Sequence, residues 1–141
     1  MILKELLKTM TIETEIDKSV AKPDLESRKN TNMLIPDLVT VVVPVFNGEV
    51  FILETILSIV QQDYEFIEVL VINDGSTDRT SEVLATINYP NVRLIERSNV
   101  GVSASRNFGL RNVRSEFVVF LDSDDVLPQT FVRESCIFKR V

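Results

Sequence analysis

The sequence predicts an α/β fold in which a mainly parallel sheet is built from alternating strands and helices. Short runs of apolar, mostly β-branched residues recur along the chain, and a turn with Gly, Asn, Asp or Ser follows each run. Uniformly apolar strands are typical of sheets covered on both faces, and strands that alternate with helices are typical of parallel sheets. The predicted order of elements is βαβαβαβα.

The first strand is expected at residues 39–45, which are apolar apart from Thr40. Pro44 lies near its end, where a missing N–H group is tolerated. A turn at residues 46–48 leads into a helix, because apolar residues then recur three and four positions apart. These residues are Ile52, Leu53, Ile56, Leu57, Ile59 and Val60.

Two further strand and helix units come next. The second strand is expected at residues 66–73, and residues 74–78 form a turn whose Ser, Thr or Asp can cap the next helix. A short third strand at residues 91–96 precedes a helix over residues 103–110. Small side chains in that helix predict a close approach to the sheet.

The fourth strand, residues 117–121, is apolar throughout and is expected to be buried on both faces. Asp122, Asp124 and Asp125 follow it directly. Carboxylates so close together repel one another and raise each other's proton affinity, so a compensating cation is expected. The chain has no His, and a hard divalent cation is the simplest candidate. Pro128 then suits the first turn of a last helix.

Three other interpretations of this acidic stretch are a turn without function, an EF-hand calcium loop and the acidic strand end of a P-loop protein. An acidic turn without function would contain the same residues, because Asp and Ser are common in turns. An EF-hand is excluded, since Val126 and Leu127 occupy the fifth and sixth loop positions, where a ligand and a Gly are required. A P-loop is excluded, since no G-x-x-x-x-G-K-[ST] segment occurs.

Composition limits the class of protein. The 141 residues, of which 45% are hydrophobic and 26% charged, suffice for one globular domain. A net charge of −6 argues against nucleic-acid binding, which needs basic clusters. Cys136 is the single cysteine, and neither a signal peptide nor an apolar run of about 20 residues occurs. We therefore expect a cytoplasmic location with at most peripheral membrane contact.

Residues 1–37 differ in composition from the rest of the chain and are interpreted as a leader and linker. Five of their six basic residues are Lys, whereas only Lys139 is Lys among the nine basic residues after position 38. Apolar residues at the start have helical spacing, which predicts a short amphipathic helix, and residues 13–32 are polar and without pattern. The domain is expected to cover residues 38–141.

Polar residues follow the ends of all four predicted strands: Asn47, Asp74, Asn99 and residues 122–125. In a parallel sheet these positions meet at one edge, which is where ligands bind in open α/β sheets. The dinucleotide fingerprint G-x-G-x-x-G is absent, since the four glycines are at positions 48, 75, 101 and 109. The edge is therefore not the usual NAD site, and another nucleotide is a better candidate.

Four ordered segments carry a family resemblance: V-V-V-P-V-F-N at 41–47, V-I-N-D-G-S-T-D at 71–78, N-V-G-V-S-A-S-R-N at 99–107 and F-L-D-S-D-D at 120–125. Together they resemble the family-2 glycosyltransferases, which have the Rossmann-like, nucleotide-binding GT-A fold. The resemblance covers residues 38–131, the N-terminal half of the family's domain. It implies transfer of a sugar from a nucleotide-diphosphate donor, usually UDP, with inversion and with Mg or Mn.

The resemblance also implies roles for single residues. Pro44, Phe46, Asn47 and Glu49 would line the nucleoside pocket, and Asp74 would accept a hydrogen bond from the base. Asn99 and Arg106 would approach the base or the diphosphate. The metal would be held by Asp124 and by Asp122, which would also face the ribose. In the family Tyr is common where this chain has Phe46, so stacking is kept and a hydroxyl is lost.

The family's catalytic base and acceptor site lie after the D-x-D loop, so the base is expected beyond Val141 and the chain is expected to be a truncated domain. The acceptor, whether saccharide, lipid or protein, is not indicated. The fourth strand has no successor to cover its far edge, which leaves that edge available for self-association.

Two alternatives from other functional classes stay open. The stretch from Asp122 also resembles the haloacid-dehalogenase phosphatase motif, in which Asp122 would be the nucleophile and Asp124 the acid/base. That motif normally opens its domain, whereas three strand and helix units precede it here. The second alternative is a module that binds a nucleotide and catalyses nothing.

Overall fold

A computed structural model describes residues 34–137 of the chain. Their elements run β1 (Ile35–Val45), α2 (Ile52–Val60), β2 (Ile67–Asp74), α3 (Thr80–Ala85), β3 (Val92–Arg97), α4 (Val102–Arg111), β4 (Ser115–Phe120) and α5 (Phe131–Ile137). The predicted alternation of strands and helices is confirmed. The amphipathic helix predicted at the start of the leader lies outside the described residues.

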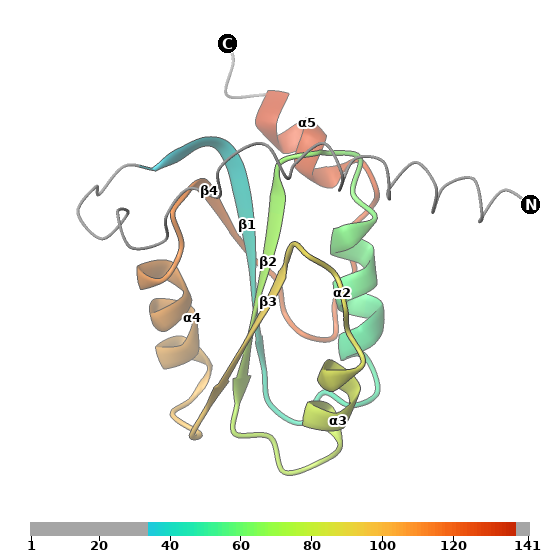
Figure 1. Ribbon diagram of the computed structural model, residues 1–141, viewed down its shortest axis with the longest axis vertical. Coiled ribbons are helices and arrows are strands. Elements are labelled where there is room, and N and C mark those ends of the chain that lie inside the picture. Colours follow the sequence, from blue (N-terminus) through green and yellow to red (C-terminus); the bar gives the residue numbers. More distant parts are fainter. Residues whose placement is uncertain (1–33, 138–141) are drawn as a thin grey trace, which may run out of the picture. The chain divides into compact units, whose positions relative to one another are not determined.

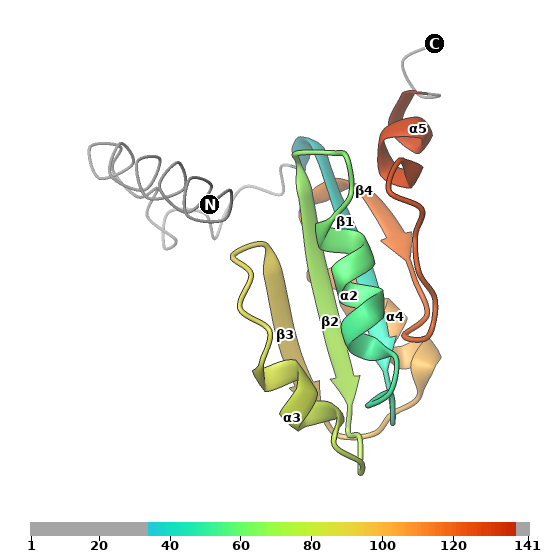
Figure 2. The same cartoon turned by 90° about the vertical axis from the view of Figure 1, so that its right-hand side faces the viewer.

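The four strands form one parallel sheet in the order β3-β2-β1-β4. In register, Val43 of β1 pairs with Val71 of β2, and Val41 pairs with Val119 of β4. The carboxyl ends of the four strands all lie at the same end of the sheet, and the loops that follow them lie together there (Figures 1 and 2). The central position of β1 explains its composition, because it has a neighbouring strand on each side and a helix layer on each face.

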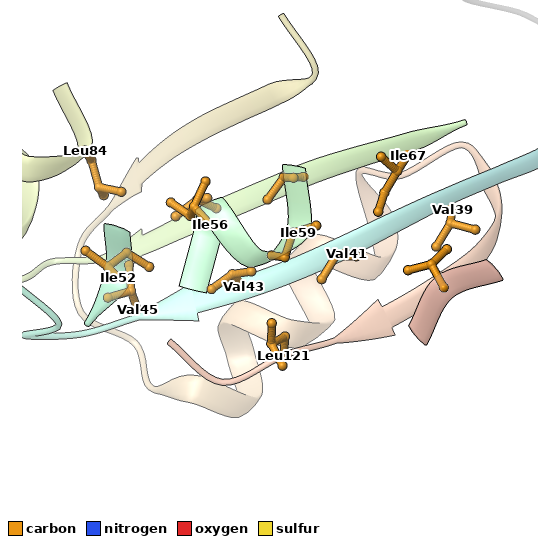
Figure 3. Close-up of a cluster of buried hydrophobic side chains, with 13 residues drawn as sticks. Val39, Val41, Val43, Val45, Ile52, Ile56, Ile59, Ile67, Leu84 and Leu121 are labelled. Atoms are coloured by element: carbon orange, nitrogen blue, oxygen red, sulfur yellow. The ribbon is translucent and has the colours of Figure 1, made fainter. Parts of the chain in front are cut away.

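Helices cover both faces of the sheet (Figure 1). On one face, α2 directs Ile52, Ile56 and Ile59 onto the odd-numbered valines of β1 (Figure 3). These three side chains are fully buried, and burial of each contributes about 1.5–3 kcal/mol. Leu84 of α3 and Val132 of α5 belong to the same cluster, so three helices share this core.

Helix α4 covers the opposite face, against Val42, Leu70 and Ile72. A Cβ atom on Gly109 would lie 2.6 Å from Val42 Cγ1, which is closer than side chains pack. The close approach predicted from the small residues of this helix is therefore confirmed. It places the N-terminal half of α4, which carries Arg106, beside the carboxyl end of β1.

The fourth strand packs against the cores on both faces, as predicted, but its apolar side chains are only partly buried. β4 is an edge strand, and Phe120 is 43% exposed, whereas Val41 to Val43 of β1 are fully buried. An apolar run does not distinguish an edge strand from a central one, because both pack on the core. Among the described residues β4 pairs with β1 and is the last strand of the sheet on that side; self-association through this edge stays a prediction.

Two boundaries also differ from the sequence-based expectation. β1 begins at Ile35, before the expected start of the domain at residue 38. Pro128 does not lie in the first turn of the last helix, because α5 begins at Phe131, whose N–H donates to the Pro128 carbonyl at 3.0 Å. Among residues 34–137, no helix is both long and apolar enough to cross a membrane.

Candidate functional site

A cavity of about 560 Å³ lies at the carboxyl ends of β1 and β4. Its volume falls in the range of small-molecule sites. β2 and β3 extend the sheet on one side of β1 and β4 on the other, so the cavity occupies the point at which strand order reverses. It is lined by Pro44, Val45, Phe46, Asn47, Gly48, Phe51, Asp74, Val102, Arg106, Asp122, Ser123 and Asp124.

Most of the predicted site residues meet in this cavity. Those that line it are Pro44, Phe46, Asn47, Asp74, Arg106, Asp122 and Asp124. Two predicted nucleotide contacts, Glu49 and Asn99, are exposed and do not line it. The cavity thus gathers side chains from the end of β1 and the loop after it, from the last residue of β2, from the loop after β4 and from α4.

Asp74 is the buried polar residue of the cavity, with only 3% of its surface exposed. Its two carboxylate oxygens accept hydrogen bonds from the N–H groups of Val100 and Gly101, at 2.9 and 2.8 Å. Gly101 has a φ of 94°, a left-handed conformation that suits Gly. Each oxygen keeps a further lone pair, so Asp74 is a rigidly held acceptor facing the cavity.

Arg106 and Asp122 form an ion pair across the cavity, with 2.5 Å between Nη2 and Oδ1. Their side chains are 38% and 55% exposed, so the pair adds little to stability and is accessible to a ligand. The Nε atom of Arg106 is buried and has no hydrogen-bond partner among the described residues. The ion pair with Asp122 uses one N–H of Nη2, and a guanidinium has five N–H donors, so donor capacity is left at the exposed end of the side chain for an anion.

Asp122 and Asp124 reach the cavity, but Asp125 does not. Asp125 closes the turn instead, since its N–H donates to the Asp122 carbonyl at 3.1 Å. Within residues 34–137, no three Asp, Glu, Cys or His side chains are grouped to hold a metal, so the expected cluster of three carboxylates is wrong. Two carboxylates do fit Mg²⁺, which takes one or two protein carboxylates and completes its shell with water and substrate phosphates.

Polar residues in α2 and just after it hold the acidic loop and the segment that follows it. Thr55, fully buried, donates from Oγ1 to the Ser123 carbonyl at 2.9 Å, and Ser58 Oγ accepts from the Leu127 N–H at 3.1 Å. Gln62 donates to the Pro128 carbonyl and accepts from the Val132 N–H. These supporting residues were not predicted, although polar residues on the apolar side of a helix are a signal that could have found them.

The loops after β1 and β2 are tied by hydrogen bonds that run in both directions, here called the loop bridge (residues 47–49 with 76–80). Three consecutive N–H groups, those of Asn47, Gly48 and Glu49, donate to Ser76 Oγ, Thr80 Oγ1 and Asp78 Oδ2 at 3.0, 2.9 and 3.2 Å. In return, Asn47 Oδ1 accepts from the N–H groups of Thr77 and Asp78, at 2.8 and 3.3 Å, and Glu49 Oε2 accepts from that of Arg79 at 2.8 Å.

The loop bridge changes the acidity of Asp78. Desolvation opposes the change, but hydrogen bonds from the hydroxyl and N–H of Thr80 and from the N–H of Glu49 outweigh it and lower the pKa of Asp78. The Thr80 N–H, at 2.9 Å from Asp78 Oδ1, lies in the first turn of α3. The N-cap residue of α3 is Arg79, and it makes no side-chain cap hydrogen bond, so the cap predicted from a Ser, Thr or Asp of this turn is wrong. Asp78 precedes the cap position and accepts from the Thr80 N–H.

Apolar cavity residues were also missed. Phe51 and Val102 line the cavity from the starts of α2 and α4, and each is about half exposed. Their position just before or at the start of a helix, where exposed apolar side chains are less expected, is the signal that the sequence offers.

A family model described as glycosyl transferase family 2 matches residues 40–134. The chain belongs to this family. GlyA of Streptococcus pneumoniae, a glycosyltransferase, is 40% identical over 111 residues, which cover 77% of this chain and 16% of GlyA.

Solved structures of similar proteins share the fold. S. aureus TarS 1-349 in complex with UDP-GlcNAc has a TM-score of 0.67 and 30% identity, over 73% of this chain and 31% of TarS 1-349. The mannosyltransferase PcManGT from Pyrobaculum calidifontis, in complex with GDP-Man and Mn²⁺, has a TM-score of 0.59 and 33% identity, over 64% and 28%. The GT-A fold prediction is confirmed, and the chain spans less than a third of each of these three relatives.

Proposed function

We propose that this chain is the donor-binding part of a glycosyltransferase that moves a sugar from a nucleotide-diphosphate sugar to an acceptor hydroxyl, with inversion and with help from Mg or Mn. UDP is the proposed nucleotide, in line with the UDP-GlcNAc bound by TarS. The observation that carries the proposal is the cavity itself, which combines a fixed acceptor, an accessible guanidinium and two carboxylates.

The nucleoside is proposed to bind between the loops after β1 and β2. Phe46 and Pro44 offer an apolar wall against which a flat base can stack. Asp74 offers carboxylate oxygens whose direction is fixed by two backbone N–H groups, and these can accept from the imide N–H of uracil.

The diphosphate is proposed to bind at Arg106. An incoming phosphate would compete with Asp122 for the guanidinium, since both are anions that accept charge-assisted hydrogen bonds. The exchange would release the Asp122 carboxylate, and Asp122 with Asp124 would then hold the metal. When bound, Mg²⁺ or Mn²⁺ offsets the negative charge that develops on the departing diphosphate.

Deprotonation of the acceptor hydroxyl needs a base placed beside the acceptor. The cavity carboxylates are assigned to the nucleotide and the metal, so we assign none of them as this base and expect no sugar transfer by residues 1–141 alone. A bound donor could still hydrolyse slowly, because assistance to the leaving group does not require an acceptor.

Calorimetry with UDP and uridine tests the proposal. We expect weak UDP binding that Mg²⁺ or Mn²⁺ strengthens, and weaker uridine binding that the metal does not change. No heat with UDP at any metal concentration would reject the proposal. Release of phosphate from simple phosphomonoesters would favour the phosphatase alternative instead.

A further inference from the structure

Asn47 uses two of its polar atoms, the backbone N–H and Oδ1, within the loop bridge. Oδ1 accepts from two backbone N–H groups and, at 3.3 Å, from the Thr77 hydroxyl, while the Asn47 N–H donates to Ser76. Its φ is 52°, a left-handed conformation that Asn and Asp tolerate better than other residues with a Cβ. An acceptor and a left-handed backbone together account for Asn at this position, which also lines the cavity.

Glu49 is used in the same way. Its carboxylate accepts from the Arg79 N–H and its own N–H donates to Asp78, and it does not line the cavity. Both residues therefore bond to the second loop. Glu49 lies outside the cavity to which the family resemblance assigns it, whereas Asn47 also lines the cavity.

We propose that Asn47 and Glu49 are positioning residues, which act on the nucleoside through the loop bridge and not by touching it. Phe46, the proposed stacking surface, directly precedes Asn47, and Asp74, the proposed acceptor for the base, directly precedes the second loop at Gly75. The loop bridge therefore fixes the positions of Phe46 and Asp74 relative to one another. This inference rests on the proposed nucleotide site. Because the bridge is exposed, its value lies in holding the empty site in the binding geometry more than in overall stability.

Asn47→Asp and Asn47→Gly separate this role from direct contact. Asp keeps an oxygen acceptor and tolerates the left-handed backbone, but it loses the Nδ2 donor. Gly keeps the backbone conformation and loses the acceptor. Uridine is the probe, because it carries no phosphate that a new carboxylate could repel. A positioning role predicts uridine binding within about twofold of wild type for N47D and about tenfold weaker for N47G.

A direct contact through Nδ2 predicts the reverse, with N47D at least as damaged as N47G, and that result would overturn the inference. Glu49→Gln keeps an acceptor for the Arg79 N–H and should retain uridine binding, whereas Glu49→Ala should weaken it several-fold. Glu54→Ala, which removes an exposed carboxylate from the outer side of α2, is the matched control and should change nothing.

Hydrogen exchange tests the bridge without any ligand. The N–H groups of Gly48 and Glu49 donate to Thr80 and Asp78, whose side chains N47G leaves intact. If the bridge acts as a unit, these two amides exchange about tenfold faster in N47G and at the wild-type rate in N47D. Unchanged exchange in N47G would overturn the inference. Failure of wild-type protein to bind uridine would instead count against the proposed nucleotide site.

Discussion

The two sides of the cavity differ in how far their polar groups are already paired. On the side of β1 and β2, Asp74 accepts hydrogen bonds from two backbone N–H groups, and polar groups of the neighbouring loops bond to one another in the loop bridge. On the side of β4, Asp122 is paired only with Arg106, and Asp124 is exposed and has no hydrogen bond or ion pair within the described residues.

This difference indicates a division of labour within one site. The base of a nucleoside is rigid and neutral, and it binds best to a preformed pocket. Fixing the protein groups that contact it in advance lowers the entropy lost on binding. A metal and a diphosphate bring their own charge and ligands. Their side of the cavity therefore needs carboxylates and a guanidinium that are free to exchange partners.

The largest expected effect comes from the preformed side. Asp74→Ala removes the proposed charged acceptor for the base, and a hydrogen bond to a charged group contributes about 2–3 kcal/mol to binding. It also leaves the N–H groups of Val100 and Gly101 without their partner, which lowers stability. Calorimetry should show uridine and UDP binding weakened alike, by about 30- to 100-fold. Asp74→Asn keeps one oxygen and should lose less. If UDP binding were weakened and uridine binding were not, Asp74 would act on the diphosphate or the metal and not on the base.

The exchangeable side should respond to a different probe. Asp124→Asn removes a carboxylate without changing side-chain size, and it should abolish most of the strengthening of UDP binding by Mn²⁺, about tenfold, while uridine binding stays at the wild-type level. Titrations of both ligands with and without Mn²⁺ measure this. Asp125→Asn is the matched control, because Asp125 lies outside the cavity. Equal effects of the two substitutions would remove the special role of Asp124.

The fold was predictable because its signals are local. The apolar runs of β1 and β2 and the stripe of α2 each reflect burial of that segment, and the loops that carry Asn47, Asp74 and Asp122 follow from strand order. The uncovered edge of β4 was predicted from the lack of a following strand, but the partial exposure of its side chains was not, because an apolar run does not show how completely helices cover a strand. The direction in which Glu49 and Asp125 point was missed for a similar reason, because side chains in a loop follow the hydrogen bonds they find.

The smallest expected effect concerns acid stability of the loop bridge. The pKa of Asp78 is lower in the folded protein than its ordinary value of 3.8, so its contribution to stability is complete above that value and is lost as the pH falls through the lowered one. Asp78→Asn should therefore flatten the fall of unfolding free energy below about pH 4, by a small amount because the group is exposed. Urea unfolding at a series of pH values from about 2 to about 6 measures this slope, which reflects the difference in bound protons between the two states. A steeper fall in the variant would contradict the direction of the shift.

A crystal structure of the full chain with UDP and Mn²⁺ tests the division of the cavity most directly. We expect the base against Phe46 and hydrogen-bonded to Asp74, with the loop bridge unchanged from the ligand-free form. We also expect Mn²⁺ at Asp122 and Asp124, and Arg106 turned from Asp122 to the diphosphate. Two results would contradict this division of the cavity: a loop bridge that opens to admit the base, or an Arg106–Asp122 pair that stays intact while the diphosphate binds elsewhere.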